Sequence, residues 1–422
     1  MIDPRVRTAY FVGGVPKVKN TPAAGRPLFL VLIALFSGAT LAAQDPTPVD
    51  DFDVVWEAVA EYYVDDSFGG VSWDAMREEY RPRVQSAPDV ESAYGAIGEM
   101  LGRLENDDTF VIPPSVVPEL ATAAVGQREE EYAGVGVMIS DFREVGVVVT
   151  GTFRESPAEG AGVLPGDTIV AVDGEPLVKE EGTQGVADRV RGPVGSEVTL
   201  TLRDPDGEDR DVTITRGRID LRPSVDARVI RPGIGYIRLP AITTDLVQQA
   251  SRALPALLST SGIALDLRGI GTGTPEAMVV LAQWFLGPTR LGTIVTREES
   301  FPIPHRPDAI AAYRGPVVVI TDSRTSGVAE VLAQVLREYD RARIVGATTR
   351  GGSQVAQVVP LPSGGLLHLV IARYVTPKGM LLHTEGIEPD VELAPPDLAT
   401  IRAGEDPYLD RAEEIIRRGG RI

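Results

Sequence analysis

The chain of 422 residues contains no cysteine, only four lysines and only three histidines. Without cysteine it forms no disulfide, has no thiol nucleophile and offers no thiolate to a metal. The histidines His305, His368 and His383 lie in separate segments, and none has the spacing of a metal ligand to another. We therefore predict neither a metal nor a cofactor.

Positive charge is also scarce beyond the N-terminus. Residues 1–43 are typical of a secretory signal, because basic residues precede the apolar run Leu28 to Phe36 and small residues near Ala42 offer a cleavage site. Its removal leaves 36 Lys and Arg against 59 Asp and Glu, a net charge of −23. This charge argues against nucleic acid and anionic membranes as partners.

We therefore predict export to the periplasm or the extracellular side. A retained N-terminal membrane anchor is the alternative, although an apolar run of this length spans a bilayer poorly.

Residues 50–112 have the spacing of a helical segment. Apolar residues recur with helical period over Phe52 to Tyr63, Trp73 to Val84 and Ser92 to Leu104. Residues 113–127 lack such a pattern and are predicted to be a linker.

The next segment, 128–217, has the glycine pattern of a binding module. Tyr132 to Ile139 (YAGVGVMI) and Ser156 to Gly174 (SPAEGAGVLPGDTIVAVDG) resemble a PDZ domain, which accepts the C-terminus of a peptide as an added strand. A plain β-barrel with glycine turns is the alternative. The resemblance implies the following roles: the loop of Gly134, Val135, Gly136 and Val137 binds the terminal carboxylate, and Val186 and Val190 line a side-chain pocket.

Residues 224–395 carry alternating strand and helix patterns. Gly315 to Ile320 is predicted to be a buried strand, Glu330 to Tyr339 an amphipathic helix and Arg341 to Gly346 the next strand. With Gly346 to Gln357 (GATTRGGSQVAQ), this order is similar to the C-terminal processing peptidases, or tail-specific proteases. These use a Ser/Lys dyad supported by a Gln. The resemblance implies a crotonase/ClpP-like α/β core, followed by a C-terminal tail over 396–422.

The dyad positions themselves are vacant on this alignment. Matching Glu330 and the Thr349-Arg350-Gly351 segment to the family places Gly327 at the nucleophile, Gly352 at the base and Ala356 at the Gln.

No other lysine replaces the missing base. A serine nucleophile needs an adjacent group that takes its proton near neutral pH, and a lysine does this only when its pKa is lowered by about three units. Beyond the leader the chain has only Lys179, in another domain, and Lys378, in a turn that the family does not use for chemistry. Arg350 is close in sequence, but a guanidinium does not deprotonate in proteins.

Three further residues bear on the site. Ser326 is one residue from the nucleophile position, and is either a surrogate nucleophile or a helix-capping or turn-forming residue beside Glu330. Gly273 is the oxyanion candidate, because the resemblance places a glycine-rich loop with backbone N–H donors there. Asp108 stands where the family has a His.

The sequence thus predicts an α/β multidomain chain with an N-terminal helical segment, a PDZ β-barrel module and a crotonase/ClpP-like peptidase core. The predicted function is that of a pseudopeptidase that binds the C-terminal tails of exported proteins, with an active relative as a further candidate partner. The alternatives are an active serine-type peptidase that uses Ser326 or another substitute nucleophile, and a hydrolase that acts on something other than peptides.

Overall fold

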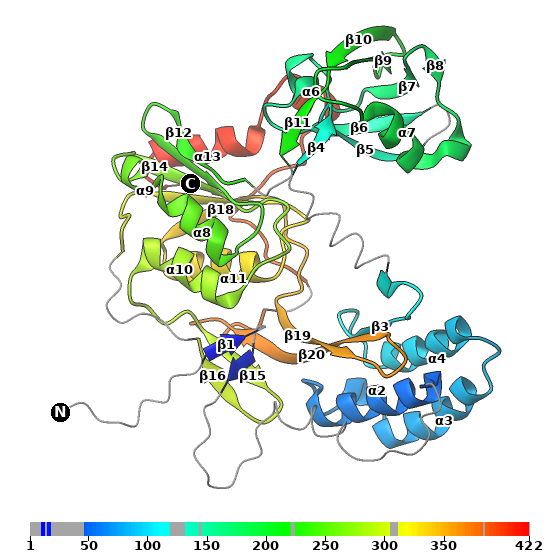
Figure 1. The fold of residues 1–422 in the computed structure, drawn as a ribbon. Helices are drawn as coiled ribbons and strands as arrows, with labels where there is room; N and C mark the ends of the chain where they lie inside the picture. The colour runs from blue at the N-terminus through cyan, green and yellow to red at the C-terminus, as the bar shows by residue number, and fades with distance from the viewer. Residues whose placement is uncertain are drawn as a thin grey trace. The chain divides into compact units, whose positions relative to one another are not determined.

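The computed structural model forms two compact units (Figure 1): the first comprises residues 1–121, 224–393 and 411–422, and the second comprises 122–223 and 394–410. The described residues are 10–12, 15–17, 46–118, 131–142, 146–220, 224–303, 311–382 and 385–421. Residues 119–127 of the predicted linker lie outside them, as does most of the predicted leader except strands β1 (Tyr10–Val12) and β2 (Val15–Lys17). None of the helices in these ranges is both long and apolar enough to cross a membrane.

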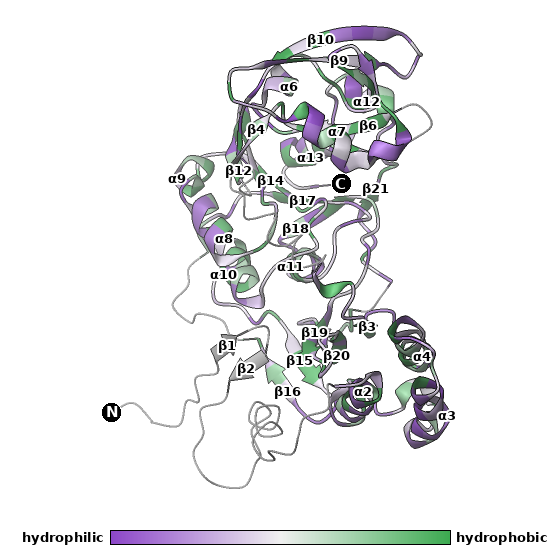
Figure 2. Cartoon of the chain, turned by 45° about the vertical axis from the view of Figure 1, so that its right-hand side comes forward, coloured by the Kyte–Doolittle hydropathy of each residue, from purple (hydrophilic) through white to green (hydrophobic). Residues whose placement is uncertain are grey.

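The first unit begins with a three-helix bundle. Its helices are α2 (Pro48–Tyr62), α3 (Trp73–Gln85) and α4 (Val90–Gly102). The side chains of Ser72 and Asp89 cap α3 and α4 by accepting hydrogen bonds from backbone N–H groups. Figure 2 shows α3 as largely hydrophilic, since much of its surface faces solvent.

The apolar face of this bundle packs on an antiparallel sheet in the order β16-β15-β20-β19, in which β3 also pairs with β20. The strands are β3 (Phe110–Ile112), β15 (Thr293–Thr296), β16 (Ser300–Pro302), β19 (Gln354–Pro360) and β20 (Leu366–Val375). The carboxylate of Asp51, which is buried, accepts hydrogen bonds from Tyr94 Oη (2.7 Å) and Ser363 N (2.9 Å). These hydrogen bonds join the helical bundle to the turn between β19 and β20.

The core of the first unit is a second sheet, in the order β12-β13-β14-β17-β18-β21, whose strands are parallel from β13 onward. They are β12 (Asp226–Arg231), β13 (Ile234–Arg238), β14 (Gly262–Asp266), β17 (Val317–Thr321), β18 (Ala342–Gly346) and β21 (Val391–Glu392). The middle strands are apolar and fully buried, as expected for a parallel sheet with both faces covered.

Helices cover this sheet. They are α8 (Thr244–Ser251), α9 (Leu254–Leu257), α10 (Pro275–Leu286) and α11 (Val328–Glu338). Figure 1 shows α8, α10 and α11 on one face. Near the chain end, Ile416 of α13 (Pro407–Arg417) packs against Gly262, where a Cβ would lie 2.2 Å from the isoleucine.

The second unit contains a sheet in the order β10-β9-β7-β6-β5, so β5 is an edge strand. The unit consists of β4 (Glu131–Gly134), β5 (Val137–Phe142), β6 (Val147–Thr152), α6 (Pro157–Gly160), β7 (Thr168–Val172), β8 (Glu175–Pro176), α7 (Gly182–Val190), β9 (Glu197–Arg203), β10 (Asp209–Thr215), β11 (Gly217–Asp220) and α12 (Leu398–Arg402). Arg402 of α12 donates to the buried carboxylate of Asp167 at 2.8 Å. Part of the predicted tail therefore folds with this unit.

Candidate active site and peptide-binding loop

Gly327 begins helix α11 at the end of the loop that follows β17. It is the N-cap residue, with φ 62° and ψ −130°, a backbone conformation that strains residues with a Cβ. The nearest atom to a Cβ placed here would be Gly352 O, at 4.0 Å. The position therefore has room for a side chain, although its backbone favours glycine. The capping role considered for Ser326 is wrong, because Gly327 is the residue at the cap.

The buried carboxylate of Glu330 holds the two halves of the site together. It is 1% exposed and accepts hydrogen bonds from the N–H groups of Gly327 (3.1 Å) and Gly351 (2.7 Å). The hydroxyls of Thr349 and Ser353 also donate to it. The loop after β18 is thereby fastened to the start of α11, and the two predicted dyad positions, Gly327 and Gly352, become neighbours.

Ser326 is buried beside the glycine-rich loop. Its N–H donates to Ile270 O at 2.9 Å, and its Oγ lies 3.0 Å from the place of a Cβ on Gly271. Among the described residues, no hydrogen bond joins Ser326 Oγ to an acid, a histidine or a lysine. His368 is engaged elsewhere, since its Nδ1 lies 2.6 Å from Asp108 O and its ring stacks on Phe110. His305 and His383 lie outside the described residues.

The oxyanion candidate lies against the same helix start. Gly273 forms a parallel bridge with Ile242, and a Cβ on it would be 2.4 Å from Val328 Cγ2. Helix α10 begins just beyond, where Thr274 caps it by accepting from Ala277 N at 3.3 Å. The structure therefore brings Gly273 close to Gly327, as an oxyanion donor would require.

The other two predicted positions differ in their surroundings. Ala356 lies on β19 next to a β-bulge and packs against the core of the helical bundle. The Asp108 carboxylate faces the predicted base position, with Oδ2 3.7 Å from the place of a Cβ on Gly352. A lysine introduced at this position would meet a negative charge.

A small pocket adjoins Gly327. It measures about 60 Å3, and its lining is mainly apolar, with contributions from Met278, Val331 and Tyr374. The hydroxyl-bearing Ser353 also lines it. No sequence pattern points to Ser353, and only its donation to Glu330 in the folded chain reveals that it belongs to the site.

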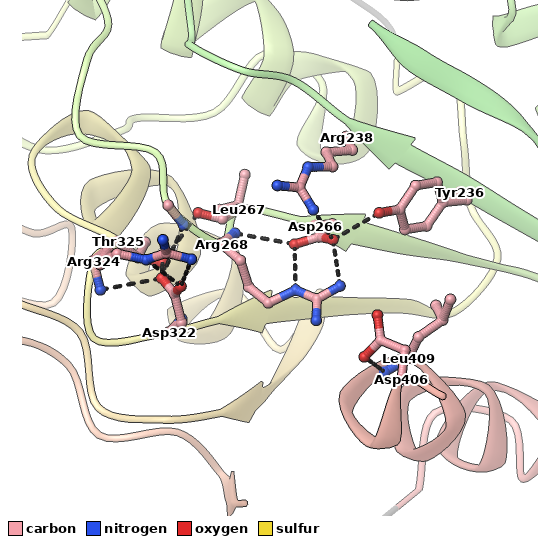
Figure 3. Close-up of polar contacts among 11 residues, drawn as sticks. Tyr236, Arg238, Asp266, Leu267, Arg268, Asp322, Arg324, Thr325, Asp406 and Leu409 are labelled. Atoms are coloured by element: carbon pink, nitrogen blue, oxygen red, sulfur yellow. Dashed lines mark hydrogen bonds and ion pairs between the residues drawn. The ribbon is translucent and has the colours of Figure 1, made fainter. Parts of the chain in front are cut away.

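A buried ionic cluster lies at the end of β14, just before the glycine-rich loop in the chain (Figure 3). Asp266, at the end of β14, accepts from Arg268 Nη2 (2.7 Å) and Tyr236 Oη (2.7 Å), and Arg238 approaches within 3.5 Å. Burial by itself raises the pKa of Asp266, but the hydrogen bonds and charges of the two arginines and the tyrosine outweigh it and hold the pKa below the usual value of an aspartate. The ionised form is therefore the one that folding favours.

This cluster predicts an acid-dependent loss of stability. Because the folded pKa is depressed, the contribution of Asp266 is present above its unfolded pKa and is lost as the pH falls through the folded pKa. The Asp266→Asn variant should lose about 3 kcal/mol of unfolding free energy at pH 7 and depend less on pH between roughly 5 and 2 than the parent.

Urea titrations at each pH, followed by tryptophan fluorescence, measure the unfolding free energy of the first unit, which contains all three tryptophans. The exposed Asp107, changed to Asn, is the control. Equal losses in the two variants at pH 7 would contradict the role given to Asp266.

The predicted carboxylate loop of the second unit presents backbone donors. Val135 O accepts from Ala158 N (2.9 Å) and Gly136 O accepts from Phe153 N (2.9 Å), so both carbonyls point toward the interior. In a trans peptide the following N–H points the opposite way, which directs the N–H groups of Gly136 and Val137 outward. Gly136 has φ 81°, which this turn requires.

Tyr132 and Arg191 flank this loop. The Tyr132 ring folds against Gly134, where a Cβ would be 2.6 Å from it, and its phenol oxygen accepts from Gly136 N. The Arg191 guanidinium lies 5.5 Å from the ring centroid. A carboxylate is a stronger acceptor than a neutral phenol. The carboxylate of a bound peptide is therefore suited to replace the Tyr132 phenol as the acceptor of the Gly136 N–H.

The predicted side-chain pocket is less open than expected. Val186 is fully buried and Val190 is 6% exposed, because both pack into the core of the second unit. By contrast Met138, on the edge strand β5, is 42% exposed. β5 also ends the strand order of this sheet, so one of its edges pairs with no other strand of that sheet.

Comparison with known proteins gives the same arrangement. Residues 233–393 match the peptidase family S41, 148–204 match the PDZ domain and 48–102 match the Tricorn protease C1 domain. The chain is 31% identical to a carboxyl-terminal-processing protease of Picosynechococcus, over 86% of this chain and 87% of the relative. It is 27% identical to the carboxy-terminal processing protease CtpB of Bacillus subtilis, over 77% of this chain and 67% of the relative.

Among solved structures, the chain resembles the photosystem II D1 C-terminal processing protease, with a TM-score of 0.52 and 30% identity, over 85% of this chain and 97% of that one. The predicted fold class is confirmed in its three parts: the N-terminal helices, the PDZ domain and the α/β peptidase core. The chain therefore belongs to the carboxyl-terminal-processing peptidases of family S41.

Proposed function

We propose that this chain is an exported pseudopeptidase, which binds the C-terminal tails of other exported proteins through its PDZ domain and does not cleave them. The observation that carries the proposal is the pair Gly327 and Gly352, adjacent in space with neither a hydroxyl nor a base on either residue. The Glu330 network still builds the frame around them. Loss of a nucleophile alone costs on the order of a million-fold in turnover.

Tail binding is supported by the PDZ match and by the geometry of its loop. The N–H of Val137 suits a terminal carboxylate, as does the N–H of Gly136 once the carboxylate displaces the Tyr132 phenol, and the edge strand β5 suits an added peptide strand. Export is proposed from the leader over residues 1–43. Membrane attachment would require that this segment be retained.

The experiment combines cleavage and retention of an unstructured protein with an apolar C-terminus. Mass spectrometry should find the substrate intact after incubation with the mature chain and with its Ser326→Ala variant, while the immobilised chain retains it. The same substrate ending in an amide should bind about tenfold more weakly, because a charge-assisted hydrogen bond is lost.

A matched pair of glycine variants tests the loop. A Cβ on Gly136 would lie 2.4 Å from Ser156 Cβ, whereas a Cβ on Gly174 would meet no atom within 4 Å, and the two residues have similar φ values of 81° and 78°. Gly136→Ala should abolish retention and Gly174→Ala should preserve it. Cleavage by the parent but not by Ser326→Ala would instead make Ser326 the nucleophile and overturn the proposal.

A further inference from the structure

A polar pocket of about 290 Å3 opens at the start of two of the strands that lead to the candidate active site. Its walls are the residues that enter β17 and β18 and the chain just beyond α13. The charged residues of its lining are Arg314, Asp340, Arg341 and Arg343, and its glycines are Gly315, Gly419 and Gly420. Since β17 and β18 are parallel and the candidate active site follows their C-terminal ends, this pocket is separate from that site.

Arg341 is held rigidly at the pocket. Its Nε donates to Phe285 O (2.9 Å) and its Nη2 to Tyr313 O (2.8 Å), and the rings of these two residues lie 5.9 and 5.8 Å from the guanidinium. Burial lowers its pKa. Within the described residues the guanidinium has no carboxylate partner. A partly buried charge that is matched only by carbonyl dipoles is incompletely compensated.

The two other arginines are little neutralised. Arg343 approaches Asp340 only to 3.9 Å, and the aspartate side chain is 81% exposed, so this pair is weak. Arg314 is exposed and has no ion pair among the described residues. Three arginines against one aspartate give the lining a net charge of +2, in a chain whose net charge is −19.

We propose that this pocket binds a phosphate dianion, either as inorganic phosphate or as the phosphate group of a small monoester. Guanidinium groups donate charge-assisted hydrogen bonds to phosphate oxygens. Arg341 is oriented by the two carbonyls that accept from its Nε and Nη2, and its Nη1 has no hydrogen-bond partner among the described residues. The dianion balances the charge of the lining. A pocket of this size holds a phosphate with a small substituent.

Calorimetric titration of the full chain with inorganic phosphate, at constant ionic strength, tests the proposal. Saturable binding of one phosphate per chain is expected. Arg314→Gln and Arg343→Gln should each weaken it about tenfold, since each removes a charge-assisted hydrogen bond. Neither side chain bonds to the backbone within the described residues, so both variants should fold. Arg228→Gln, which removes an equal charge on β12 away from the pocket, should change the affinity less than about twofold.

The same titration with glycerol phosphate, a phosphate monoester, and with succinate, a dianion without phosphate, distinguishes the ligand classes. Tighter binding of glycerol phosphate than of inorganic phosphate would identify the ligand as a monoester, and weaker binding would identify it as the free ion. The proposal is overturned if phosphate gives no saturable heat, if both pocket variants bind like the parent, or if succinate binds as tightly as phosphate.

Discussion

Tail cleavage should appear when four side chains are changed together: Gly327→Ser, Gly352→Lys, Ala356→Gln and Asp108→Asn. The parent should leave a tail substrate intact, and the fourfold variant should cleave it at least about a thousandfold faster than background, part of the million-fold that a nucleophile contributes. The reason is geometric. The Cβ positions of Gly327 and Gly352 are free of close contacts, and the loop and helix that hold them are already joined by Glu330.

Asp108 is included because of its charge. Its Oδ2 lies 3.7 Å from the Cβ place on Gly352, so it would stabilise the protonated form of a lysine there and raise its pKa. A threefold variant that retains Asp108 should therefore cleave more slowly at neutral pH than the fourfold variant. Each unit by which Asp108 raises the pKa of the lysine should lower the rate about tenfold. The rate of the threefold variant should also increase as the pH is raised.

The matched control has Ala in place of Ser at position 327 and keeps the other three changes. Both proteins carry the backbone strain of side chains at φ 62° and at φ 89°, about 1–3 kcal/mol each, but only one has the hydroxyl. Mass spectrometry of the cleavage products compares the rates of the two proteins, and circular dichroism establishes that both are folded. A folded fourfold variant without activity would mean that the frame is no longer competent. A parent that cleaves equally fast would refute the pseudopeptidase proposal.

Replacing Glu330 by Ala should destabilise the first unit by about 3–5 kcal/mol, the cost of leaving a buried polar network without its charged partner. Two backbone N–H groups and two hydroxyls would lose their acceptor. Urea unfolding, followed by the tryptophan fluorescence of the first unit, measures the loss. Hydrogen exchange of peptides covering 346–353 should accelerate, because Gly351 N–H is no longer held.

Glu57 is the control for this prediction. It is exposed on α2, and its change to Ala should alter the unfolding free energy by less than about 0.5 kcal/mol. If the Glu330 variant unfolds at the parent's urea concentration and residues 346–353 exchange no faster, then Glu330 does not hold the site together.

Local pattern was sufficient for much of the fold. The apolar run before Thr321 predicted the buried strand β17, and the helical period from Glu330 onward predicted most of α11, which begins two residues earlier at Val328. Capping was harder to assign. Ser326 has the residue type of a cap, but the backbone turns at Gly327, and the glycine N–H binds Glu330 instead.

The openness of a pocket was beyond the sequence. Val186 and Val190 have the spacing of a helix face, yet that face packs into the core of the second unit instead of opening to solvent. The spacing of apolar residues along a helix identifies its buried side, but it does not tell a protein core from a ligand pocket.

The amino-acid sequence by itself determined which side chains are available for chemistry. Glycine stands at 327 and 352, the positions that the resemblance assigns to the Ser/Lys dyad, and only two lysines follow residue 43. Tertiary structure alone decided what surrounds these two glycines. Ser353, Glu330 and Asp108 come from separate segments, and Arg314 and Arg341 line one pocket only because two strands begin side by side. Such contacts depend on chain topology, which residue spacing does not record.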